Sequence, residues 1–168
     1  MVQFDSGVSI TVEPNKLQVR DAGDRCDPEG GPVAAIAAKY LRVLPHVPYT
    51  GIGINFSSVA SAADPTSQIS ERFLKPGPWH NERRPLRAVG LRFVYQIDDA
   101  RLTIGLEPAM YQRIRDGKVS DPIAVISASA NFHRELDTGR ATEHAVSIIE
   151  ATPRDWNRFN QILQEILS

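Results

Sequence analysis

The sequence is poor in cysteine and has no long apolar run. Cys26 is the one cysteine among 168 residues, which excludes an internal disulfide framework and any metal site built from several cysteines. No apolar stretch approaches the ~20 residues of a membrane-spanning helix, and the first residues lack the basic and apolar regions of a secretory signal. We therefore expect a soluble protein in a reducing compartment, the cytoplasm, with no membrane partner.

Strong net charge and catalytic motifs are also missing. The formal net charge is −1, so the chain has no overall field to hold nucleic acid, and nucleic acid is not an expected partner. The sequence contains no His-x-x-x-His, Gly-x-Ser-x-Gly or catalytic cysteine pattern, and its four histidines lack the spacing of metal ligands. We expect no metal, no cofactor and no catalytic residue of a recognised pattern.

The clearest pattern that is present covers residues 86–107, where apolar and other residues alternate as in a β-hairpin. If Asp98 and Asp99 form a two-residue turn, each apolar residue faces an apolar partner across the strands. A slip of one residue would destroy this match, so the pattern predicts the register too. The expected pairs are Tyr95 with Leu102, Phe93 with Ile104 and Leu91 with Leu106.

Shorter patterns predict the other elements. Residues 8–19 form a hairpin around Pro14 and Asn15 that pairs Val12 with Leu17 and Ile10 with Val19, and residues 50–58 and 122–134 alternate as strands. Helices are expected from Pro32, from an N-cap at Asp64, around residues 145–149, and from an N-cap at Thr152. The first helix should bury the stripe Val33, Ile36, Ala37, Tyr40, Leu41 and Leu44.

These elements predict one α+β domain over residues 1–168. We expect two layers, with a largely antiparallel sheet of about six strands, helices packed on one face and a C-terminal helix. A chain of this length buries roughly 70% of its unfolded surface, which is enough for an ordinary core. The sequence shows no repeat and no linker that would divide it.

Sorting the strands by face gives one apolar face and an opposite face of small and polar residues. Here Arg92 lies opposite Gly105 and diagonal to Glu107, close enough for an ion pair. Glycine and serine are poor strand formers, so their density suggests that another surface lies close. This small-residue face comprises Ser9, Thr11, Gly51, Gly53, Asn55, Gly90, Arg92, Thr103, Gly105, Glu107, Ser127, Ser129, Asn131 and His133.

Three interpretations of the small-residue face remain open: a self-association surface, which we place first, a solvated sheet face, and a ligand cleft. The candidate partner contacts are Gly51, Gly53, Gly90 and Gly105, with Trp79, Arg83 and Arg84 in the polar loop 75–85. Residues 108–122 form a long connection that could serve as a lid or contact arm.

The sequence thus favours a non-catalytic interaction protein that forms a homodimer. The alternative is a small-ligand-binding protein or an enzyme that uses a cleft on the polar face. Its acid, base and anion-binding groups would be Glu107, His133 and Arg92, with Asn55 and Asn131 as hydrogen-bonding side chains.

Overall fold

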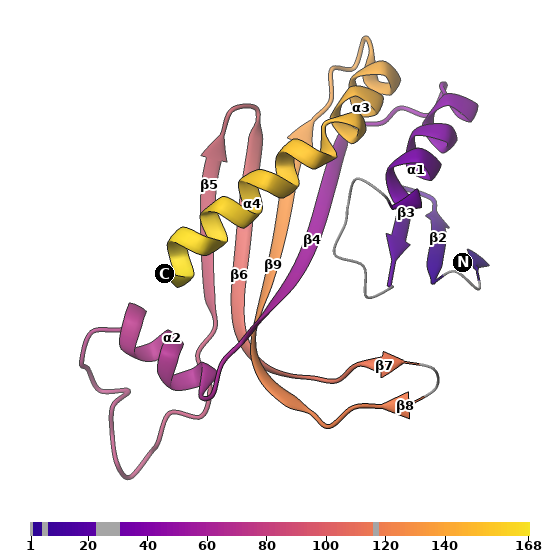
Figure 1. Ribbon diagram of the computed structural model, residues 1–168. Helices are drawn as coiled ribbons and strands as arrows, with labels where there is room; N and C mark the ends of the chain where they lie inside the picture. Colours follow the sequence, from indigo (N-terminus) through magenta and orange to yellow (C-terminus); the bar gives the residue numbers. More distant parts are fainter. Residues whose placement is uncertain (1, 5–6, 23–30, 116–117) are drawn as a thin grey trace. The chain divides into compact units, whose positions relative to one another are not determined.

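A computed structural model describes residues 2–4, 7–22, 31–115 and 118–168 (Figure 1). These residues form four helices and nine strands, and the chain ends in a helix. The expected α+β class with antiparallel pairing and a C-terminal helix is confirmed. Cys26 lies outside the described residues. The chain divides into two compact units, residues 1–54 with 133–168, and residues 55–132.

The described strands are distributed over three sheets rather than one. The first sheet has the order β1-β2-β3, the second the order β4-β9-β6-β5, and the third consists of β7 and β8. The main sheet therefore has four strands, and the N-terminal hairpin belongs to a separate sheet. The strands are β1 Val2–Gln3, β2 Val8–Glu13, β3 Lys16–Asp21, β4 Gly51–Ser61, β5 Leu91–Ile97, β6 Ala100–Tyr111, β7 Ile114–Arg115, β8 Lys118–Val119 and β9 Ile123–Glu135.

The first unit begins with the expected N-terminal hairpin. Strands β2 and β3 pair with Val12 opposite Leu17 and Ile10 opposite Val19, as predicted. Since Ser9 and Thr11 lie on β2, in a different sheet from the other members of the small-residue face, their assignment to that face is wrong. Alternation assigns a residue to one side of its strand, but it does not say which sheet the strand joins.

The core of the first unit forms where helix α1, Pro32–Val43, packs against helix α3, Ala141–Glu150. Helix α1 buries Ala38 and Leu41, and Ala34 and Ala37 pack against the same cluster. Ala37 and Leu41 belong to the expected stripe, whereas Ala34 and Ala38 do not, and Tyr40 of that stripe is only half-buried. Alanines suit this contact because short side chains let two helices approach closely. The cluster is completed by Leu136, Ala145, Val146, Ile148 and Ile149.

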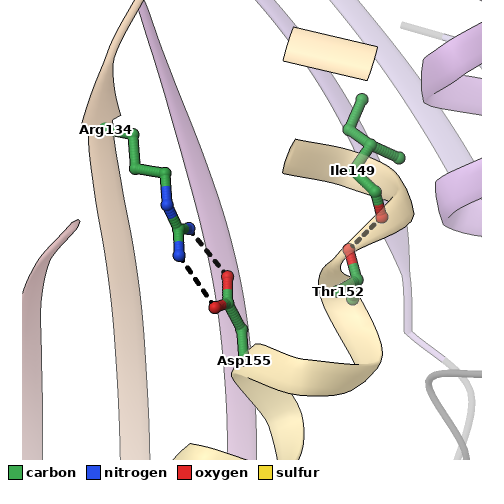
Figure 2. Close-up of polar contacts among 4 residues, drawn as sticks. All are labelled: Arg134, Ile149, Thr152 and Asp155. Carbon is green, nitrogen blue, oxygen red and sulfur yellow. Dashed lines mark hydrogen bonds and ion pairs between the residues drawn. The ribbon is translucent and has the colours of Figure 1, made fainter. Parts of the chain in front are cut away.

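The C-terminal helix α4, Thr152–Leu167, follows α3 after a single residue, Ala151. Ala151 occupies the N-cap position, so the expected cap at Thr152 is wrong. The Thr152 hydroxyl instead donates to the Ile149 carbonyl at 2.6 Å, at the corner between the two helices (Figure 2). The buried side chains of α4 include Phe159 and Leu163, whereas Trp156 is half-buried.

The second unit contains the central hairpin, and all three predicted pairs are confirmed. Asp98 takes a positive φ of 50° in the two-residue turn, a backbone region that aspartate tolerates better than most residues. Helix α2, Pro65–Phe73, begins as predicted, because the Asp64 carboxylate accepts a hydrogen bond from the Ser67 backbone N–H at 2.9 Å. The Phe73 ring lies 5.7 Å from that of Phe93, which places α2 against the apolar side of the hairpin.

Residues 108–122 are more regular than a loop, because β6 continues to Tyr111 and β7 and β8 pair beyond it. Pairing between β5 and β6 ends at Leu91 and Leu106, so Pro108 lies where β6 has no β5 partner. Proline is tolerated in a strand where its missing N–H would have no ladder partner. Figure 1 shows the β7–β8 hairpin between the ends of β6 and β9.

Candidate functional site

The polar side of the second unit forms a continuous surface across four strands. Arg92 on β5 lies opposite Gly105 on β6. A Cβ added at Gly105 would lie 2.9 Å from the Ser129 hydroxyl on β9, and Asn131 Nδ2 on β9 donates to Asn55 Oδ1 on β4 at 2.8 Å. We call this surface the polar sheet face; it comprises Asn55, Arg92, Thr103, Gly105, Glu107, Ser127, Ser129 and Asn131.

Two of the candidate glycines have neighbours within the chain that explain their lack of a side chain. A Cβ at Gly51 would lie 3.2 Å from the His133 ring, and a Cβ at Gly105 would meet Ser129. Gly90 precedes β5, is exposed, and would place a Cβ 3.4 Å from Glu107 Cγ, which is an ordinary contact. Gly53 is exposed on β4. Close packing by a second molecule is therefore not needed to account for Gly51 or Gly105.

The residues of the enzyme alternative are placed in different units. Arg92 and Glu107 are exposed in the second unit, and the structure records no ion pair between them within its described residues. His133 is half-buried in the first unit, beside Gly51. Arg92 and Glu107 do lie diagonally across the two strands, as expected. An ion pair between two solvated side chains contributes little free energy, which accounts for the missing contact.

The polar loop 75–85 is folded upon itself. The Trp79 indole N–H donates to the Lys75 carbonyl at 3.0 Å, and the ring covers Gly77, where no Cβ would fit. The Asn81 side chain accepts from the Arg83 backbone N–H, and the Asn81 carbonyl accepts from the Arg84 N–H, both at 2.9 Å. Trp79 is thus held by its own loop, while the side chains of Arg83 and Arg84 are exposed.

The β7–β8 hairpin carries Ile114, which at 75% exposure is the most exposed large apolar side chain in the described part of the second unit. Ile114 and Val119 lie opposite each other across the hairpin. Both are more than half exposed, as is Met110 at the end of β6. Exposed apolar side chains gathered in this way are typical of a contact surface, as expected for residues 108–122.

An open depression lies elsewhere, at the start of α3. It is lined by Asp137, Arg140, Glu143, His144 and Ser147, and none of these is a candidate residue. His144 Nδ1 accepts from the Asp137 backbone N–H at 3.2 Å, so this histidine stabilises the turn before the helix. Within the described ranges, no three residues of the metal-binding types are grouped to hold an ion, and no helix is long and apolar enough to span a membrane.

The sequence interpretation missed two features. Arg134 on β9 and Asp155 on α4 form a buried two-pronged ion pair, with N–O distances of 2.7 and 2.8 Å (Figure 2). Strand alternation offered a signal, because Arg134 follows the buried Ala130 and Phe132 at two-residue steps. The other missed feature is the position of β5 at the edge of its sheet, which strand patterns alone do not reveal.

Comparisons with protein-family models, with curated proteins and with solved structures find no match to the chain.

Proposed function

We propose that the protein is a non-catalytic, cytoplasmic interaction protein that forms a homodimer partly through the polar sheet face. The observation that carries the proposal is the openness of this face: Asn55, Arg92, Glu107 and Ser129 are all exposed. Apart from Arg92 and Glu107, the residues of the face have short side chains, so a second surface could approach the strands closely.

Apolar side chains on the same side of the sheet support the proposal. By strand alternation, Val94 lies on the side of Arg92 and Val59 on the side of Asn55. Their exposed fractions are 57% and 45%. Each valine thus leaves about half of its surface in water, whereas at a two-fold interface this surface would be shielded in both subunits.

A charge placed at the centre of the polar sheet face tests this proposal. Ser129→Arg puts a long cation on β9, a strand with neighbours on both sides, and Gly90→Arg puts one at the start of β5. Both side chains would point away from the apolar side, so each variant should keep the wild-type circular dichroism. Light scattering should show a dimer for the wild type and monomers for both variants.

The matched control is Ala35→Arg, which adds the same side chain at an exposed position of α1 and should leave the dimer intact. A wild-type protein that remains monomeric at high micromolar concentration would overturn the proposed self-association. If Ser129→Arg and Gly90→Arg both remain dimeric, the polar sheet face is not part of the interface.

A further inference from the structure

We propose that the open edge of β5 pairs with β5 of a second copy, joining two four-stranded sheets into one continuous antiparallel sheet. The inference rests on the proposed self-association, but it places the contact at the backbone edge of the sheet instead of across the polar sheet face. Because β9 lies two strands from β5, a dimer formed by edge pairing alone should survive Ser129→Arg. Strand β5 is the last strand in the order β4-β9-β6-β5, and Figure 1 shows it with β6 as its one neighbouring strand.

The hairpin geometry fixes which backbone groups of β5 point to the edge. In a two-residue hairpin the residues that flank the turn, Ile97 and Ala100, form a hydrogen-bonded pair, and such pairs alternate with non-hydrogen-bonded ones. The N–H and C=O groups of Arg92, Val94 and Gln96 therefore point away from β6. Among the described residues, no hydrogen bond reaches these backbone groups.

The strand carries little of what usually blocks edge pairing. Its seven residues contain no proline, no lysine and no glycine, and Arg92 is the only charged residue within it. Natural edge strands avoid association by being short, charged, bulged or covered. An edge with a regular row of outward N–H and C=O groups is instead a template for an added strand.

A second copy of β5 fits this template because the strand is symmetric about Val94. An antiparallel pairing with Val94 opposite its own counterpart places Arg92 opposite Gln96 of the second copy, and Phe93 opposite Tyr95. Polar side chains then meet polar ones, apolar side chains meet apolar ones, and no like charges face each other. All seven residues are used, and about six hydrogen bonds form, two for each hydrogen-bonded pair.

The burial of side chains on the apolar side of the hairpin also favours a second copy of β5 as the partner strand. Leu102, Ile104 and Leu106 on β6 are fully buried, whereas their partners on β5 remain partly exposed. A further strand beyond β5 would cover these partners, and the second copy would supply the matching apolar side chains. The partly exposed residues are Leu91, Phe93, Tyr95 and Ile97.

Amide hydrogen exchange, measured residue by residue as a function of protein concentration, separates edge pairing from association through the polar sheet face. Edge pairing predicts that the amides of Arg92, Val94 and Gln96 exchange about tenfold more slowly at a concentration well above the dimer dissociation constant than below it. Association through the face alone would bury side chains and leave these three amides exchanging equally fast at both concentrations.

A pair of substitutions at Val94 provides the second test. Val94→Pro removes the outward N–H but no hydrogen bond to β6, and proline is tolerated on an edge strand in this orientation. Val94→Thr keeps the N–H and the branched shape. We expect Val94→Thr to remain dimeric and Val94→Pro to become monomeric, with wild-type circular dichroism for both.

The outcomes distinguish this inference from the proposed function. A dimeric wild type with no concentration-dependent protection of the three amides would overturn edge pairing while leaving self-association in place. A dimeric, folded Val94→Pro variant would do the same. A wild type that is monomeric at high micromolar concentration would overturn both.

Discussion

Replacing Asp155 with alanine should destabilise the protein by about 3–5 kcal/mol, because the Arg134 guanidinium would stay buried without its counter-charge. The side chains of Arg134 and Asp155 are only 7% and 4% exposed, and both guanidinium nitrogens that face the carboxylate bond to it. Little of either side chain is in contact with water, so solvation compensates poorly for the lost charge. The loss is a large fraction of the 5–15 kcal/mol that typically holds a domain folded.

The chain offers a matched control in the ion pair between Arg42 and Glu150. It joins the same types of group at 3.1 Å, but its side chains are 58% and 63% exposed. Exposed pairs contribute about 0–1 kcal/mol, because water already solvates both charges. Glu150→Ala should therefore cost less than about 1 kcal/mol, and the difference between the two alanine variants measures the effect of burial.

Urea unfolding, followed by circular dichroism and tryptophan fluorescence, supplies the free energies. A double variant, Arg134→Met with Asp155→Leu, removes both charges and should be more stable than Asp155→Ala, since apolar residues of similar size need no counter-charge. The reasoning is refuted if Asp155→Ala loses no more than Glu150→Ala. It is equally refuted if the double variant is less stable than Asp155→Ala.

Two further predictions concern the helices. Phe159→Ala should lower the free energy of unfolding in urea by about 3–5 kcal/mol, because the ring is fully buried. Trp156→Ala should lower it by less, because Trp156 is half-buried. An equal or larger loss for Trp156→Ala would contradict this ranking. The hydrogen bond from the Ser67 backbone N–H to the Asp64 carboxylate lowers the pKa of Asp64 below its usual value of 3.8. The ionised carboxylate therefore stabilises the folded state at any pH above the unfolded pKa, and this stabilisation is lost as the pH falls through the lower folded pKa. The difference in melting temperature between the wild type and Asp64→Ala should therefore narrow below about pH 4. Asp64→Asn keeps a capping side chain that does not ionise, so its difference from Asp64→Ala should not change in this pH range. A wild-type difference that stays constant in acid would count against the cap.

The sequence predicted the central hairpin to the residue because its information is local. A slip of one residue would place Leu91, Phe93 and Tyr95 opposite polar residues or glycine, and a two-residue turn at Asp98 and Asp99 then selects the observed register. The helix start at Asp64 was equally predictable, since the cap and the following proline act within one turn. Signals of this kind need no knowledge of the rest of the fold.

Other features depend on contacts between distant segments, and the sequence pattern failed there. Ser9 and Thr11 alternate like the residues of the main sheet, yet nothing in β2 indicates that it joins a separate sheet. The inward position of Arg134 is readable from alternation, but its partner lies 21 residues away on a helix. Ala38 is buried in the cluster that α1 forms with α3, whereas Tyr40 is half-buried, and the sequence of α1 alone does not indicate this neighbouring helix.

The glycines that first suggested an interface are weaker evidence for one than the edge of β5. Gly51 and Gly105 make room for His133 and Ser129 of the same chain, so their presence requires no second molecule. The outward backbone groups of Arg92, Val94 and Gln96 have no such internal explanation, since no described residue bonds to them. A dimer that survives both Ser129→Arg and Val94→Pro would have to use another surface. The exposed apolar side chains of Ile114 and Val119 on the β7–β8 hairpin would then be the next residues to replace with charges.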